Sequence, residues 1–182
     1  GINRYHSKTP LQPNNVKDLN RNHADAPNGF FVAGPQNGVG TIYVPKVIEQ
    51  NGWHTVSGWV RGNQGANMSF AVSMAAQALS ERFYTGVDNE WQRFEFSFDV
   101  TNYSEDRYNY ITFFLYSYTY YLFKDIKVEK GNIATDWSPA PEDMLGKETF
   151  TLFKNDYDDT AKSVERRLTA IDSSEEGSVV TR

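Results

Sequence analysis

The chain has 182 residues, of which 39% are hydrophobic and 15% aromatic, and its formal net charge is −5. This length suits one globular core with an appendage, and the absence of cysteine excludes disulfides, thiolate metal sites and cysteine nucleophiles. The acidic balance without a basic patch disfavours nucleic acid or an anionic membrane as the main partner, and no apolar run is long enough to predict a membrane span.

Short strands separated by turn residues are predicted for most of the chain before Tyr108. The expected strands span 2–8, 30–33, 41–44, 55–61, 68–76 and 91–100. Turn and stop signals stand between them, at Asn28-Gly29, Gly34-Pro35, Pro45 and Asn51-Gly52. No helical period competes in this part of the chain.

Alternation within these strands predicts which side chains face the core. In the fourth strand Val56 and Val60 fall on one face, which we expect to be buried, so Trp59 and Arg61 lie on the outer face. The fifth strand sets inward Phe70, Val72 and Met74 against outward Ser69, Ala71, Ser73 and Ala75, and the sixth places Phe94, Phe96, Phe98 and Val100 inward. The small outward residues of the fifth strand are expected to leave open space beside Trp59.

The stretch 108–143 predicts two more strands, joined by a tight return. The first sets inward Ile111, Phe113 and Leu115 against outward Thr112, Phe114 and Tyr116, and the second places Leu122, Ile126 and Val128 on its apolar side. Gly131 ends the second strand, and Pro139 and Pro141 force an extended exit. We therefore predict an all-β fold, an antiparallel β-sandwich.

After Leu145 the apolar period becomes helical. The apolar positions are Phe150, Phe153, Tyr157, Ala161, Val164, Leu168 and Ile171, a coiled-coil-like stripe with one step that departs from a strict heptad. We predict a sandwich domain over 1–143, a helical connector over 144–172 and a flexible terminus over 173–182. The connector either packs on the sandwich, pairs with copies of itself, or frays where its continuation is missing.

Catalytic and metal-binding patterns are sparse. The histidines His6, His23 and His54 are scattered without metal-ligand spacing, and the sequence holds no nucleophile elbow and no phosphate-binding glycine loop. Two carboxylate pairs, Glu95 with Asp99 and Asp88 with Glu90, have spacings open to a glycosidase. Solvated strand and turn charges explain both pairs better, so we predict that the chain is not an enzyme.

Four segments carry a resemblance to a known family. Lys-Asp-Ile-Lys-Val-Glu-Lys-Gly at 124–131 and Ala-Thr-Asp-Trp-Ser-Pro-Ala-Pro-Glu-Asp at 134–143 are similar to the last strand and exit of carbohydrate-binding-module-like jelly rolls in tail and baseplate proteins of phages of Gram-positive bacteria. Thr-Val-Ser-Gly-Trp-Val-Arg-Gly at 55–62 and Trp-Gln-Arg-Phe-Glu-Phe-Ser-Phe at 91–98 resemble two internal strands. The resemblance covers residues 1–143 and implies a galactose-binding-like jelly-roll sandwich.

The resemblance also raises the question of a structural calcium ion. Related carbohydrate-binding jelly rolls hold Ca²⁺ with an aspartate of the last strand, and Asp125 occupies a similar place. The matching N-terminal ligand pattern is absent between His23 and Gly34. Calcium takes about six or more oxygen ligands, and the missing N-terminal pattern leaves this set incomplete. We therefore predict no cofactor, with a structural calcium ion as the alternative.

Aromatic side chains carry the functional prediction, because sugar C–H faces stack on rings while their hydroxyls need polar partners. The predicted carbohydrate-binding residues are Trp59, Arg61, Tyr116 and Tyr118 on the outer face, with Tyr84 from the loop before Trp91. Ordinary packing is the alternative for each of them. Trp53 and Trp137 are weaker candidates, and Trp137 is expected to cap the core.

The resemblance implies a noncatalytic carbohydrate-binding module of a phage tail or baseplate protein. Its expected partner is cell-wall or surface polysaccharide of a Gram-positive host, its expected location is the virion tail, and the expected oligomer is a trimer formed through the C-terminal helix. A chain that opens at Gly1 without Met is expected to be part of a larger protein. The alternatives are a structural spacer without glycan binding and an accessory domain of a cell-wall hydrolase.

Overall fold

The computed structural model describes residues 1–116 and 119–144. The contacts within the chain define two units, Gly1–Ser138 and Pro139–Arg182, and all described strands lie in the first. The described part of the second unit contains the short helix α1 (Pro141–Met144). Apart from Met144, the predicted connector at 144–172 and terminus at 173–182 lie outside the described residues. Within the described residues, no helix is long and apolar enough to cross a membrane.

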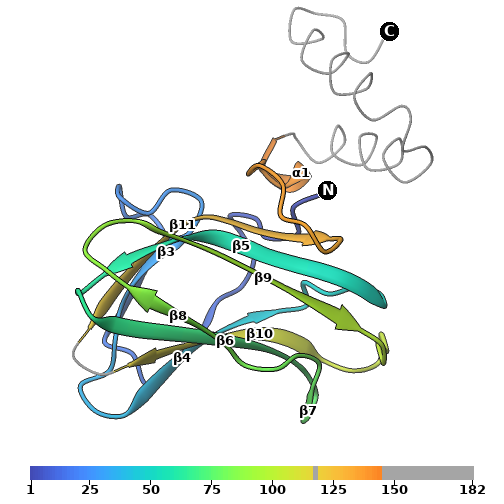
Figure 1. Cartoon of the computed structure of the whole chain (residues 1–182), viewed down its shortest axis with the longest axis horizontal. Coiled ribbons are helices and arrows are strands. Elements are labelled where there is room, and N and C mark those ends of the chain that lie inside the picture. The colour runs from blue at the N-terminus through green and yellow to red at the C-terminus, as the bar shows by residue number, and fades with distance from the viewer. Residues whose placement is uncertain (117–118, 145–182) are drawn as a thin grey trace, which may run out of the picture. The chain divides into compact units, whose positions relative to one another are not determined.

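The strands form two antiparallel sheets that pack face to face (Figure 1). The six-stranded sheet has the order β1-β4-β10-β6-β7, with β8 also paired to β6: β1 (Gln12–Asn14), β4 (Val39–Pro45), β6 (Ala66–Met74), β7 (Gln77–Ala78), β8 (Phe83–Val87) and β10 (Asn109–Tyr116). The five-stranded sheet has the order β2-β3-β11-β5-β9: β2 (Asp18–Asn20), β3 (Phe30–Ala33), β5 (Gly52–Gly62), β9 (Gln92–Val100) and β11 (Tyr120–Lys130). The predicted all-β sandwich of antiparallel sheets is confirmed.

The strand expected at 2–8 does not form. Arg4 N donates to Val128 O at 2.8 Å, but the neighbouring bonds come from the side chain of Asn3. Its Nδ2 donates to Ile126 O at 3.0 Å, and its Oδ1 accepts from Val128 N at 3.1 Å. The buried side-chain amide of Asn3 therefore makes the hydrogen bonds to the backbone of β11 that a paired strand would otherwise make.

The core between the sheets is built on aromatic rings. Phe123 packs against Phe30 and Phe113 with ring centroids 4.8 and 5.2 Å apart, and Phe70 lies 6.0 Å from Phe113. All four rings are buried. Val56 and Val60 lie in the same core, so the predicted inward face of β5 is confirmed.

Leu122 is a correction to the predicted pattern of β11. A bulge shifts the register between Lys124 and Lys127, and Asp125 within it has a φ of 50°. The extra residue reverses the phase of alternation, so the core-facing residues are Tyr121, Phe123, Ile126 and Val128. Leu122 instead lies opposite Arg61 and Phe31, on the outer side of the sheet.

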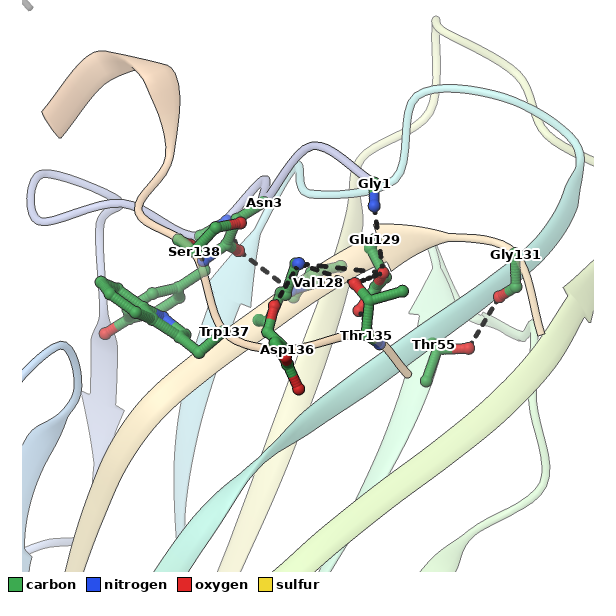
Figure 2. A network of polar contacts seen from close by, with 12 residues as sticks. Gly1, Asn3, Thr55, Val128, Glu129, Gly131, Thr135, Asp136, Trp137 and Ser138 are labelled. Carbon is green, nitrogen blue, oxygen red and sulfur yellow. Dashed lines mark hydrogen bonds and ion pairs between the residues drawn. The ribbon is translucent and has the colours of Figure 1, made fainter. Parts of the chain in front are cut away.

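The exit segment after β11 is tied to the sheet by a buried polar network (Figure 2). Glu129 and Lys127 are 0% and 2% exposed, and the Lys127 Nζ to Glu129 Oε1 distance is 3.9 Å. Thr135 donates to Glu129 from Oγ1 at 2.6 Å and from its backbone N at 3.1 Å. Lys127 Nζ donates to Asp136 O at 2.7 Å, and Trp137 Nε1 donates to Ile126 O at 3.2 Å.

His54 makes the stability of the sandwich depend on pH. Its side chain is 3% exposed and stacks on Phe98 at 5.8 Å, with Nδ1 2.9 Å from the acceptor Gly52 O. Burial lowers its pKa below the ordinary value of 6.5, and nearby Lys130 and Arg4 act in the same direction. Below that value the unfolded state binds the proton first, so stability is lost as pH falls toward the folded-state pKa.

We therefore expect the free energy of unfolding to decrease between about pH 7.5 and 5, and the slope to be shallower in His54→Phe. Urea titrations of both proteins across this range measure the two slopes. Identical slopes in the wild type and the variant would assign the pH dependence to other groups.

Candidate functional site

The two sheets separate the predicted carbohydrate-binding residues. Trp59 and Arg61 lie on β5 in the five-stranded sheet, whereas Tyr116 lies on β10 and Tyr84 on β8 in the six-stranded sheet. Tyr118 lies outside the described residues. The prediction that these side chains share one outer face is therefore wrong, because the two pairs occupy opposite outer faces of the sandwich.

The outer face of the six-stranded sheet carries aromatic rings from three strands. Ile111, Phe113 and Leu115 of β10 face the core, so the residues that alternate with them face outward. Residues directly opposite in register on the neighbouring strands share the same face of the sheet. The outward aromatic residues are Tyr43 on β4, Tyr84 on β8, and Tyr110, Phe114 and Tyr116 on β10. We call this set, together with Arg82, the six-stranded face.

Arg82 organises one end of the six-stranded face. Its guanidinium carbon lies 3.7 Å from the ring centroid of Phe114 and 5.8 Å from that of Tyr84. Arg82 Nε donates to Ser69 Oγ at 3.0 Å, and Ser69 Oγ lies 3.5 Å from the Tyr116 hydroxyl. The Tyr84 side chain is 65% exposed, so a ring beside a planar cation is open to solvent.

Tyr84 and the small residues of β6 occupy different places from those predicted. Tyr84 was expected in a loop, but β8 pairs with β6 and places it opposite Ser69. Ser69 and Ala71 were expected beside Trp59, yet they flank Phe114 and Thr112 of β10. The small outward residues of β6 therefore lie beside the aromatic residues of the six-stranded face, and not beside Trp59.

The other end of this face is also aromatic. Tyr43 meets Tyr110 edge-on with ring centroids 5.3 Å apart, and Tyr108 lies 5.9 Å from Tyr110. The Tyr110 hydroxyl donates to Ala75 O at 3.2 Å, which orients its ring. Tyr43, Tyr110, Phe114 and Arg82 were not chosen from the sequence, although the outward phase of β10 already pointed to Phe114.

The outer face of the five-stranded sheet presents tryptophan rings that already have cationic partners. Lys124 Nζ lies 4.4 Å from the Trp91 ring and 5.9 Å from the Trp59 ring. Arg61 lies 4.9 Å from the Trp91 ring, and Arg93 lies 5.7 Å from the Trp59 ring. These contacts cover ring surface that a sugar would need.

A calcium site at Asp125 finds little support in the local geometry. Asn28 Nδ2 donates to Asp125 Oδ1 at 3.0 Å, so an amide donor faces the carboxylate. The carbonyls of Pro27 and Asn28 accept from the backbone of the bulge, from Asp125 N and Ile126 N. Among the described residues, no group of three or more histidines and carboxylates could hold a metal ion.

Comparisons with known proteins identify the fold. No family model and no curated protein matches the chain. Among solved structures, a family 4 carbohydrate-binding module aligns with a TM-score of 0.54 and 12% identity, over 66% of this chain and 94% of that chain. The N-terminal cellulose-binding domain of β-1,4-glucanase C from Cellulomonas fimi aligns with a TM-score of 0.54 and 10% identity, over 72% and 95%.

A phage protein has a similar fold in part of its length. The enzymatically active domain of tailspike protein 4 from bacteriophage CBA120 aligns with a TM-score of 0.50 and 12% identity, over 70% of this chain but 20% of that chain. The resemblance to carbohydrate-binding jelly rolls is thus confirmed at the level of fold.

Proposed function

We propose that this chain is a noncatalytic carbohydrate-binding module that binds polysaccharide through the six-stranded face. The observation that carries the proposal is Arg82 stacked on Phe114 beside the exposed ring of Tyr84. The similarity in fold to carbohydrate-binding modules supports the same function.

The chemistry of this face matches the two requirements of a sugar. The exposed ring of Tyr84 offers flat apolar surface for pyranose C–H groups, and Arg82, stacked on Phe114, stands beside it. The guanidinium of Arg82 has further N–H donors beyond the one that binds the buried Ser69, and the hydroxyl of Tyr116 adds a donor and an acceptor for sugar hydroxyls. The six-stranded face therefore places a nonpolar ring next to polar groups, as a sugar requires.

The biological setting belongs to the same proposal. We propose that the module forms part of a phage tail or baseplate protein and adheres to surface polysaccharide of a Gram-positive host. The residues that resemble tail-protein jelly rolls and the partial similarity to a phage tailspike support this setting. Several copies on one assembly, as in the proposed trimer, would raise the avidity of weak individual sites.

Binding to wall polysaccharides and intact Gram-positive cells tests the proposal. We expect Tyr84→Ala to weaken binding about tenfold, because loss of one stacking ring removes about 1–1.5 kcal/mol. Arg82→Gln is expected to have a similar effect. Trp53→Ala removes another exposed aromatic side chain, one on the five-stranded sheet, and is the matched control that retains wild-type affinity.

Trp59→Ala distinguishes the two outer faces. A loss of binding in Trp59→Ala with no change in Tyr84→Ala would move the site to the five-stranded sheet. If a multivalent form of the wild type bound no wall polysaccharide, the structural spacer would replace the binding module as the better proposal.

A further inference from the structure

A pocket of about 310 Å³ lies where β4 ends and β10 begins. The segment before β1 forms one wall, and the residues around Pro45 and Tyr108 form the other. Its lining includes Arg4, His6, Gln12, Pro45, Lys46 and Tyr108.

The pocket opens directly from the six-stranded face. Gln12 lies opposite Tyr43 in the register of β1 and β4, and Pro45 lies opposite Tyr110 in the register of β4 and β10. Side chains in directly opposed positions share a face of the sheet. The ring of Tyr108 contacts that of Tyr110, so the aromatic surface continues into the pocket wall.

The charge of the pocket is opposite to that of the chain. The net charge is −5, yet Arg4 and Lys46 line the pocket, and no carboxylate is among its described lining residues. Glu49, which pairs with Arg4 at 2.8 Å, is half exposed and stands outside the lining. Such a local reversal of charge attracts an anion into a site that the rest of the surface disfavours.

Backbone contacts hold Lys46 and His6 in place. Lys46 has a φ of 55°, and its N–H donates to Asn109 O at 2.8 Å. Lys46 Nζ lies 5.8 Å from the centroid of the Tyr108 ring. Lys8 N donates to His6 Nδ1 at 3.2 Å, which fixes the His6 ring in the pocket wall. The pocket thus presents N–H donors to a ligand that arrives along the tyrosines.

Resting on the proposed glycan binding, we infer that this pocket receives the negatively charged group of an acidic polysaccharide, a carboxylate or a phosphate. An oxyanion accepts charge-assisted hydrogen bonds from Arg4 and Lys46, while its sugar ring packs on Tyr108. The module therefore prefers acidic glycans to neutral glycans of the same backbone.

Matched pairs of polysaccharides test the preference. Polygalacturonate, alginate and hyaluronate are compared with their carboxyl-reduced forms, and phosphomannan is compared with neutral mannan, at moderate and high salt. We expect the acidic member of at least one pair to bind about tenfold more tightly. The carboxylate and phosphate pairs distinguish the two sources of charge.

Charge reversal in the pocket is the decisive variant. Lys46→Glu is expected to remove the preference for the acidic member while leaving affinity for its neutral partner within about twofold. Lys17→Glu makes the same change in net charge at an exposed position outside the pocket and keeps the preference. Thermal unfolding of both variants verifies the fold.

Three results would overturn the inference, and each has a different meaning. Equal binding of acidic and neutral glycans, unchanged by Lys46→Glu, would overturn the anion pocket alone and leave glycan binding in place. Absence of binding to every member of the panel would overturn the proposed function and the pocket together. A preference that Lys17→Glu abolishes as fully as Lys46→Glu would assign it to overall charge.

Discussion

Glu129→Ala is expected to lower the free energy of unfolding by about 3 kcal/mol, because it leaves a buried ammonium without its counter-ion. Glu129 is fully buried and accepts two hydrogen bonds from Thr135, while Lys127 lies 3.9 Å away. Burial lowers the pKa of Lys127, whereas Glu129 and the nearby Asp136 raise it. Urea unfolding followed by tryptophan fluorescence measures the loss.

A double variant separates the charge effect from packing. Lys127→Met combined with Glu129→Leu removes both charges and keeps most of the side-chain volume, so it is expected to be more stable than Glu129→Ala. Hydrogen exchange should show faster exchange at Thr135 N in Glu129→Ala, since that N–H bonds to the carboxylate. A loss below about 1 kcal/mol in Glu129→Ala would mean that the network contributes little to stability.

Gly29→Ala is expected to cost 3 kcal/mol or more, or to prevent folding, because there is no room for a Cβ at this position. A Cβ on Gly29 would overlap the carbonyl oxygen of Phe123 and lie 2.6 Å from its carbonyl carbon. Both neighbours are backbone atoms of β11, next to the bulge that bonds to Pro27 and Asn28. Relief of the clash would push the chain before β3 away from β11.

Gly86→Ala is the matched control for this substitution. Gly86 lies on β8, and a Cβ there would meet no atom within 4 Å. We expect a change within about 0.5 kcal/mol, as for surface substitutions generally. Circular dichroism and urea unfolding of the two alanine variants make the comparison. Equal stabilities would show that β11 and the chain before β3 can separate without cost.

Much of the fold follows from local patterns in the sequence. The period of two in β5, β6, β9 and β10 identifies each as a half-buried strand and separates inward from outward residues. Phe113 and Val56 are core residues for this reason, and Phe114 and Trp59 are outward ones. The strands β7 and β8 escaped prediction because β7 has two residues and β8 has Gly86 among its five.

The position of the candidate site could not be predicted from the alternation of inward and outward residues, because alternation does not show which sheet a strand belongs to. Trp59 and Tyr116 are both outward, but β5 and β10 belong to different sheets, so the two side chains lie on opposite faces. Sheet membership is decided by pairing between strands distant in sequence, such as β4 with β10.

The sequence by itself determined an all-β chain, the positions of its longer strands and the inward phase of most of them, because side-chain direction in a strand is a local property. Tertiary structure alone decided that Arg82 stacks on Phe114, that the bulge at Asp125 turns Leu122 outward, and that Arg4 and Lys46 share one pocket. Each of these depends on long-range strand pairing and packing, whose free energy is spread over many contacts that no short segment encodes.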